Sequence, residues 1–270
     1  MPCVRRQQPL KQRLQNKWRR FAVARWARRD FRLNSDVPYV SFTFDDFPRS
    51  AYTDGGRILL AQGVRGTYFV SLGLLGRSGV SGPIASREDL QTLVREGHEL
   101  GCHTFEHLDG TRSTPEAFMR SIAANRAALA HSVPGRDLPV FAFPLDGPDL
   151  RIKRELGRHF LACRGGGQSF NSGVIDLNLL NAFFLDWRSR GDPEQIGRLI
   201  EENAANRGWL IFATHDVVST PSDYGCSPEC LEQIVRHACR SGARVLPMAE
   251  VLRELRVTRS TGLSKFGAGD

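Results

Sequence analysis

Short apolar runs alternate with amphipathic segments along the chain from about residue 39 onward. Apolar runs that are bounded by polar or glycine-containing segments are typical of strands buried on both faces. The candidate strands are Tyr39–Phe44, Thr67–Ser71, Glu99–Cys102, Val140–Phe143, His159–Cys163, Ala182–Leu185, Leu210–Thr214 and Arg244–Leu246. Strands that alternate with helices predict repeated βα units and a parallel sheet. Eight such strands are enough for a barrel.

Helix signals fall between these apolar runs. Ser86 followed by Asp89 predicts a capping box, and Thr114 followed by Pro115 predicts a second helix start. Further amphipathic helices are predicted at residues 193–207 and 228–240. Because the chain shows no internal repeat and no low-complexity linker, we expect one α/β domain.

Composition agrees with a single large core. With 270 residues, 41% of them hydrophobic, the chain is long enough for one α/β barrel. It contains no apolar run long enough to span a membrane, and its N-terminus lacks the pattern of a secretory signal. We divide it into a basic N-terminal extension (1–36), a main domain (37–257) and a C-terminal tail (258–270).

The net charge of +8 is concentrated at one end of the chain. Residues 1–34 hold eleven of the 37 lysine and arginine residues but one of the 29 acidic residues, Asp30. The rest of the chain therefore has a net charge of −2. Such a body supplies no extended phosphate track, which argues against nucleic acid as a partner.

The basic segment has the pattern of an interfacial amphipathic helix. Leu10, Leu14, Trp18 and Phe21 recur at helical spacing, and Trp26 lies outside this stripe. The basic side chains that point in other directions are Lys11, Arg13, Lys17, Arg20 and Arg28. The pattern predicts peripheral membrane contact through residues 10–32. A solvated basic extension is an equally good interpretation.

The six cysteines form no recognisable metal or disulfide pattern. None belongs to a Cys-x-x-Cys pair, and Cys226 and Cys230 have no second cluster that would complete a zinc site. Buried thiols and the lack of an apolar leader predict a cytoplasmic location, with membrane association through the basic segment as an addition.

Two adjacent carboxylates, Asp45 and Asp46, directly follow the predicted strand Tyr39–Phe44. In parallel α/β folds the loops after the strands converge on one face, and reactive groups gather there. Adjacent acids point in different directions, so one can bind a cation while its neighbour handles a proton. A solvated turn explains the same pair, which makes it a weak signal alone.

His103 and His107 follow the predicted strand Glu99–Cys102. Their spacing predicts both imidazoles on one face of a helical turn, an arrangement that suits a divalent transition metal. With a carboxylate they leave open coordination positions, and zinc, cobalt, iron and nickel all suit such a set. The metalloprotease motif is absent, because Thr104 rather than a glutamate follows the first histidine.

A third histidine, His215, follows the predicted strand Leu210–Thr214, and Asp186-Trp187 follows an earlier strand. A carboxylate beside an imidazole orients the ring and makes it a better proton donor to a leaving amine. Without the other two groups, a surface His-Asp pair would be the better interpretation.

Five segments, taken in chain order, resemble the NodB-type polysaccharide deacetylases, carbohydrate esterase family four. They are Thr43-Phe44-Asp45-Asp46, His103-Thr104-x-x-His107, Phe143-Pro144, Asp186-Trp187 and Ala213-Thr214-His215. The resemblance covers about residues 38–254. It implies a distorted (β/α) barrel of seven or eight parallel strands, the NodB homology domain, after a basic N-terminal helical extension.

The resemblance also implies a metal and an activity. A divalent metal, with zinc as the first expectation, would be held by Asp46, His103 and His107. The implied reaction is hydrolysis of N-acetyl groups from the amino sugars of an oligo- or polysaccharide.

The remaining roles follow from the same resemblance. Asp45 would be the base that activates the attacking water, and His215 the acid that protonates the departing nitrogen. Asp186 would orient His215. Trp187 would form one wall of the pocket for the acetyl methyl group.

Several positions depart from the family pattern. Phe47 replaces the glycine that usually follows the two aspartates, and it would add an apolar wall beside the sugar. Ala142 replaces the arginine that normally steadies the catalytic aspartate, and Arg188 is a candidate substitute. Leu145 stands where an aromatic residue is expected after Pro144. These changes affect the expected substrate contacts rather than the metal and proton-transfer groups.

A polar loop after the last of these strands adds Tyr224 as a candidate substrate contact. The altered loops keep two alternatives open. One is a metal-dependent hydrolase of another amide or a cyclic imide on the same barrel. The other is a non-catalytic carbohydrate-binding homologue, and the retained metal and proton-transfer groups argue against it.

Overall fold

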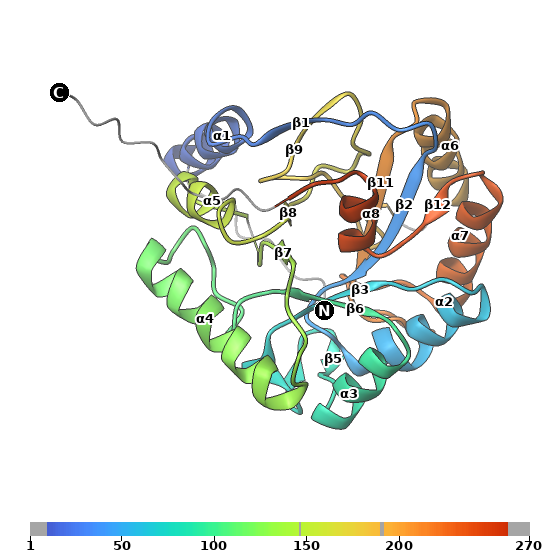
Figure 1. Ribbon diagram of the computed structural model, residues 1–270, viewed down its shortest axis with the longest axis horizontal. Helices are drawn as coiled ribbons and strands as arrows, with labels where there is room; N and C mark the ends of the chain where they lie inside the picture. Colours follow the sequence, from blue (N-terminus) through green and yellow to red (C-terminus); the bar gives the residue numbers. More distant parts are fainter. Residues whose placement is uncertain (1–9, 146, 190–191, 259–270) are drawn as a thin grey trace.

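The computed structural model describes residues 10–145, 147–189 and 192–258, with a curled parallel sheet at its centre (Figure 1). Its strands are β2 (Tyr39–Phe44), β3 (Thr67–Val70), β6 (Glu99–Cys102), β7 (Val140–Ala142), β8 (Ala162–Arg164), β10 (Phe183–Phe184), β11 (Trp209–Thr214) and β12 (Arg244–Val245). They follow the order β10-β11-β2-β3-β6-β7-β8, and β12 pairs with the first half of β2. All eight predicted strands are confirmed, although β8 lies nearer the C-terminus than predicted.

Hydrogen bonds bring the two ends of the sheet together. The Cys163 amide donates to the Leu177 carbonyl at 2.8 Å, and the Gly165 amide donates to the Leu180 carbonyl at 2.9 Å. Arg164 and Leu180 also form an isolated parallel bridge. Since Leu177 and Leu180 lead into β10, these bonds curl the sheet into the distorted (β/α) barrel that was predicted.

Helices pack around the barrel and across its amino end (Figure 1). They are α2 (Arg57–Ala61), α3 (Arg87–Arg95), α4 (Pro115–Ser132), α5 (Leu150–Leu156), α6 (Pro193–Ala205), α7 (Pro228–Arg240) and α8 (Met248–Glu254), with a π-helical turn at Ala51–Gly56 and a 3-10 turn at Leu72–Leu74. Ser86 and Asp89 form the predicted capping box at the start of α3. The Thr114 side chain caps α4. The four predicted helices are therefore confirmed.

Side chains of the central strand β2 alternate between two apolar clusters. Val40, Phe42 and Phe44 pack toward the helices, whereas Tyr39 belongs to the cluster inside the barrel. Successive side chains of a strand point to opposite faces. Asp45, the residue after β2, therefore continues the inward-facing set.

The same alternation turns two histidines into the mouth of the barrel. Ala213 of β11 belongs to the inner cluster, so His215 points the same way. Cys102 of β6 belongs to the cluster that packs toward the helices, so the side chain of the next residue, His103, points into the barrel. The sequence pattern thus directs Asp45, His103 and His215 to one place.

The predicted N-terminal helix is confirmed as α1 (Leu10–Arg25), which packs beside α5 (Figure 1). The side chains of Leu10 and Leu14 lie outside the described residues. After α1, strand β1 (Asp30–Arg32) pairs antiparallel with β9 (Val174–Asp176), so part of the predicted extension is bound to the main domain. A further short hairpin consists of β4 (Ser78–Gly79) and β5 (Gly82–Pro83). Of the predicted C-terminal tail, residues 259–270 lie outside the described residues.

None of the described helices combines the length and the apolar character needed to cross a membrane.

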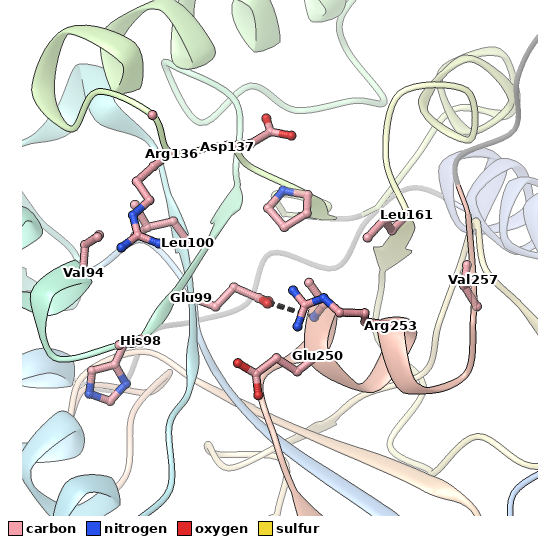
Figure 2. Close-up of a pocket in the computed structure, with 14 residues that line it drawn as sticks. Val94, His98, Glu99, Leu100, Arg136, Asp137, Leu161, Glu250, Arg253 and Val257 are labelled. Atoms are coloured by element: carbon pink, nitrogen blue, oxygen red, sulfur yellow. Dashed lines mark hydrogen bonds between the residues drawn. The ribbon is translucent and has the colours of Figure 1, made fainter.

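A cavity of about 380 Å³ opens at the amino end of the barrel (Figure 2). Glu99 at the start of β6 points into it, together with Arg253 of α8. The Glu99 carboxylate accepts hydrogen bonds from Thr67 Oγ1 and from the Ala249 amide, each at 2.9 Å, and so caps α8. Burial raises the pKa of Glu99 to about 7. This cavity is remote from the convergent side chains at the other end of the strands.

Candidate functional site

The two aspartates after β2 adopt different backbone conformations and serve different contacts. The Asp45 side chain is buried. The next two residues, Asp46 and Phe47, have positive φ angles of 65° and 59°. Such left-handed conformations are costly for residues other than glycine and concentrate at functional sites. The Asp46 Oδ1 atom is buried and accepts no hydrogen bond from any residue that the structure describes.

Two imidazoles point at this Asp46 oxygen. His103 Nε2 lies 3.4 Å and His107 Nε2 lies 3.1 Å from Asp46 Oδ1. The other ring nitrogen of His103, Nδ1, lies 2.8 Å from the Ala142 carbonyl oxygen, which leaves Nε2 free as a ligand. Burial lowers the pKa of His103 to about 4, so its imidazole is neutral at neutral pH. Neutral imidazole is the form that binds a metal.

The predicted helical turn between the two histidines is wrong. Thr104 and His107 have φ values of 61° and 59°, which no α-helix accommodates. The segment is a tight loop, in which the Leu108 amide donates to Thr104 Oγ1 at 2.8 Å. The imidazoles of His103 and His107 still lie 4.9 Å apart between ring centroids. The loop therefore provides the proximity that the helix was expected to provide.

Asp45 forms a buried ion pair that the sequence did not predict. Its Oδ1 accepts a hydrogen bond from Arg164 Nη2, and the two side chains are 5% and 1% exposed. Arg188, the predicted replacement for the family arginine, pairs with Asp186 instead. Arg164 lies at the end of β8 and just before three glycines, and that isolated cation in an apolar strand was the available signal.

The charge of Arg164 decides the ionisation of Asp45. Burial alone would raise the pKa of the carboxyl group. The positive charge of Arg164 and the hydrogen bond that its guanidinium donates outweigh burial and lower the pKa of Asp45 below its ordinary value. Asp45 is therefore an ionised acceptor at neutral pH.

His215 reaches the same cluster from β11. Its Nε2 lies 3.8 Å from Asp46 Oδ2. The expectation that Asp186 orients His215 is not met, because the buried Nδ1 of His215 has no hydrogen-bond partner among the described residues. Both Asp186 oxygens accept hydrogen bonds from Arg188. Arg188 is charged and lies only two residues after Asp186 in the chain, so its guanidinium forms the ion pair with the Asp186 carboxylate.

The predicted substrate contacts divide into buried and exposed residues. Phe47 is fully buried and packs edge-on against Tyr68 at 5.7 Å, so the prediction that it forms an apolar wall of the substrate site is wrong. Pro144 is also buried, whereas Leu145 is 67% exposed with a φ of 55°. Leu145 and Arg164 line one cavity of about 460 Å³, which links this loop to the end of the barrel where Asp45 lies.

Trp187 and Tyr224 are both partly exposed, at 46% and 42%. The Tyr224 ring centroid lies 5.5 Å from that of His215, and the Tyr224 carbonyl accepts a hydrogen bond from the His215 amide at 3.2 Å. Trp187 lines a separate cavity of about 430 Å³ together with Asp186. Tyr224 is thus the predicted substrate contact that lies nearest to a proposed proton donor.

Asp46, His103 and His107 form a group whose ligand atoms all lie within 4.8 Å of one another. One carboxylate and two imidazoles are a common donor set for zinc and related divalent ions, and three protein ligands leave positions for water and substrate. Asp45 and His215, the two predicted proton-transfer residues, adjoin this group.

A sequence model of the family described as polysaccharide deacetylase matches residues 32–158. That range includes Asp45, Asp46, His103 and His107, and it ends before His215. No curated protein matches the chain.

Several solved structures share the fold. The Xyl-CE4 domain of a multidomain xylanase from the hindgut metagenome of Trinervitermes trinervoides is 21% identical, with a TM-score of 0.57, over 83% of this chain and 94% of that one. A chitin deacetylase from the fungal pathogen Colletotrichum lindemuthianum is 19% identical, with a TM-score of 0.57, over 81% and 89%. A CE4 family pseudoenzyme from Bacillus anthracis is 13% identical, with a TM-score of 0.54, over 82% and 68%.

The curled parallel barrel, with an acid and two histidines at its mouth, has the fold of the solved CE4 structures. Residues 32–158 match the polysaccharide deacetylase family, and the chain as a whole resembles the NodB-type polysaccharide deacetylases.

Proposed function

We propose that the protein is a metal-dependent hydrolase that removes N-acetyl groups from the amino sugars of an oligo- or polysaccharide. The convergence of Asp46 Oδ1 with the Nε2 atoms of His103 and His107 carries this proposal. Asp45 and His215, which adjoin the cluster, add the proton-transfer groups that amide hydrolysis requires. The match of residues 32–158 to the polysaccharide deacetylase family supports the reaction class, and the similar structures include a chitin deacetylase and a peptidoglycan deacetylase.

The donor set fits a divalent transition metal, with zinc as the first expectation and cobalt, nickel or iron as alternatives. The unpartnered Asp46 Oδ1 favours this fit, and so does the burial of His103, which lowers its pKa and keeps its imidazole neutral. When bound, such a cation polarises an acetyl carbonyl and lowers the pKa of a water molecule.

Asp45 acts as the general base in this proposal. Its carboxylate is ionised, and Arg164 engages Oδ1, while no described residue hydrogen-bonds to Oδ2. Oδ2 is therefore the oxygen available to accept the proton of the attacking water. The water oxygen then adds to the acetyl carbon, and a backbone amide in the Phe143-Pro144-Leu145 loop is the proposed donor to the developing oxyanion.

His215 acts as the general acid. Its Nε2 lies close to Asp46, so an acetamide held at the cluster would place its nitrogen within reach of the imidazole. Protonation of that nitrogen allows the C–N bond to break, and the products are acetate and a free amine. Tyr224, beside His215, together with the exposed Leu145 and Trp187, is proposed to contact the sugar.

The direct test is acetate release from N-acetylglucosamine oligomers by chelator-treated protein, before and after addition of Zn²⁺, Co²⁺, Ni²⁺ or Fe²⁺. Metal content is measured on the same samples. We expect about one bound metal per chain, and activity that requires it. Asp46→Ala and His103→Ala should lose both metal and activity. His131→Ala, on the exposed end of α4, should retain both.

Full activity in the metal-free protein would contradict the mechanism. Hydrolysis of cyclic imides without acetate release would favour the alternative amide hydrolase. Metal and oligosaccharide binding without hydrolysis of either substrate would instead favour a non-catalytic homologue, a role for which the similar pseudoenzyme from Bacillus anthracis is a precedent.

A further inference from the structure

Arg164 and Ala142 lie opposite each other on neighbouring strands. They are Cα partners in the parallel pairing of β7 with β8, and both are buried. Ala142 belongs to the cluster inside the barrel, and paired residues of parallel strands point to the same face. The Arg164 guanidinium therefore enters the barrel at the level of the position where the family pattern has its arginine, one strand away.

Aromatic rings hold this guanidinium in place. Arg164 Cζ lies 5.0 Å from the ring centroid of Phe69 and 5.3 Å from that of Phe184. The Phe69 ring itself needs the glycine at position 101, because a Cβ on Gly101 would lie 2.4 Å from it. Since Arg164 is 1% exposed and ion-paired to Asp45, few other orientations are open to either side chain.

We propose that Arg164 is a positioning residue that holds the Asp45 carboxylate in its reactive orientation, in place of the family arginine whose position is occupied by Ala142. This inference rests on the proposed function, because the orientation of Asp45 matters only if Asp45 is the base. The small side chain of Ala142 leaves room for the guanidinium that arrives from β8. The positive charge of the arginine thus enters the barrel at the same level as in the family pattern, but from β8 instead of β7.

The test compares Arg164→Ala, Arg164→Lys and the double variant Ala142→Arg/Arg164→Ala for acetate release, metal content and thermal unfolding. We expect Arg164→Ala to lower kcat about 100-fold, with little change in KM or metal content. Guanidinium ion added at millimolar concentration should restore part of the lost kcat. Arg164→Lys should retain more activity than Arg164→Ala, and the double variant should recover activity by restoring an arginine on β7.

Outcomes for the inference and for the proposed function are separable. A wild-type protein that releases no acetate from any N-acetylated glycan overturns the proposed function. An active wild type whose kcat is unchanged in Arg164→Ala or Arg164→Lys overturns the positioning role. If Arg164→Ala does not fold, the folded Arg164→Lys variant decides, and a kcat equal to that of the wild type in this variant refutes the role.

Three aromatic side chains that contact one another are exposed on α1 and at the residue that follows it. Trp18, Phe21 and Trp26 are 62%, 55% and 45% exposed. The ring centroids of Trp18 and Phe21 lie 5.7 Å apart, and each lies 6.0 Å from that of Trp26. Contiguous exposed rings of this kind mark interaction surfaces. We refer to these three residues as the aromatic patch.

The aromatic patch is held rigidly against the barrel. Ala22 and Val23, on the opposite side of α1, are buried. Lys153 of α5 donates hydrogen bonds to the Val23 carbonyl and, at 3.0 Å, to the Trp26 carbonyl. Contacts between α1 and the main domain therefore fix the position of the aromatic patch.

Positive charge surrounds the patch. Lys17, Arg25 and Arg28 are exposed, and Asp30, which pairs with Arg28, is the one acidic residue within residues 1–34. Tryptophan side chains favour the interface between lipid headgroups and acyl chains, and lysine and arginine attract anionic lipids. The chemistry of the face thus matches an anionic bilayer surface.

We infer that the aromatic patch docks on an anionic lipid bilayer. Vesicles of phosphatidylcholine with 30% phosphatidylglycerol, about the anionic content that attracts basic surfaces, should co-sediment the full chain, whereas pure phosphatidylcholine should bind it much less. Binding should weaken with salt, and tryptophan emission should shift to shorter wavelength.

Matched variants separate the apolar and the electrostatic contributions. Trp18→Ser/Phe21→Ser/Trp26→Ser and Lys17→Glu/Arg25→Glu should each weaken vesicle binding at least about tenfold. Val80→Ser, which removes an apolar side chain that is 78% exposed elsewhere, should not. Unchanged vesicle binding by the triple variant refutes the inference. The inference is also refuted if the triple variant binds vesicles like the wild type but binds N-acetylglucosamine oligomers more weakly, because the aromatic patch would then be a glycan-binding surface.

Discussion

The Asp186 carboxylate is held by Arg188, two residues further along the chain, and not by His215. The Arg188 amide donates to Asp186 Oδ1 at 2.8 Å, and the guanidinium donates to both carboxylate oxygens. The Asp186 side chain is fully buried, so it is committed to this local pair. His215 consequently takes its place from β11 and the Tyr224 segment, rather than from a carboxylate partner.

We predict that His215→Ala and Asp186→Asn differ sharply in activity. Loss of the proposed acid should lower kcat about 100-fold or more. Asp186→Asn should lower it less than about tenfold, because the amide still accepts from Arg188 and does not touch the imidazole. Steady-state acetate release measures both. If Asp186 works only through Arg188, then Arg188→Ala should match Asp186→Asn. An Asp186→Asn defect as large as that of His215→Ala would show that the carboxylate orients His215 in the working enzyme.

Phe47 offers a test of backbone strain near the metal ligands. The φ of 59° at Phe47 is energetically unfavourable for a residue with a side chain. The ring of Phe47 is fully buried and packs on Tyr68. Phe47→Ala should lower the free energy of unfolding by about 3–5 kcal/mol, because it removes a buried ring. Phe47→Gly should be more stable than Phe47→Ala by about 1 kcal/mol, the reverse of the usual order, because glycine tolerates this φ.

Urea unfolding of the two Phe47 variants measures that order. KM for oligosaccharides should stay within about twofold of the wild type in both variants, since the ring is remote from solvent. A glycine variant less stable than the alanine variant would mean that position 47 carries no strain.

The fold could be predicted because its signals are local. Each strand of the barrel is an apolar run next to polar loops, and Asp45, His103 and His215 each follow the end of such a run. The ordering of strands and the alternation of their faces then place these three side chains together without knowledge of any long-range contact.

The parts that were missed depend on long-range contacts or on unusual backbone. Arg164 lies one residue beyond the predicted strand His159–Cys163, and only the register of β7 with β8 shows that it faces Asp45. The loop from His103 to His107 uses two non-glycine residues with positive φ, which propensities do not favour. Burial of Phe47 likewise follows from its contact with Tyr68, which is distant in sequence.

The buried pair between Lys153 and Asp176 should control how α1 is attached. Lys153 Nζ lies 2.6 Å from Asp176 Oδ2 and also donates to two carbonyls at the end of α1. Lys153→Met leaves a buried carboxylate without its partner, so we expect the free energy of unfolding to fall by about 3–5 kcal/mol. Limited proteolysis near Arg25 should also become faster. The matched control is Arg154→Met, which changes an exposed cation at the next position. Equal behaviour of the two variants would contradict an anchoring role.

Glu99 should make the stability of the protein depend on pH. Its pKa is raised by burial from an ordinary 4.5 to about 7 in the folded protein, so the folded state binds the proton more tightly than the unfolded state. The contribution of Glu99 to stability is therefore fully present below about pH 4.5. It declines as the pH rises through about 7, where the buried carboxyl group must ionise.

Glu99→Gln cannot ionise, so it should lose less stability than the wild type between pH 5 and pH 8. Glu201→Gln, on the exposed side of α6, should follow the wild type. Chemical denaturation at several pH values measures the difference, and parallel curves for wild type and Glu99→Gln would show that the Glu99 carboxyl group titrates alike in the folded and unfolded states.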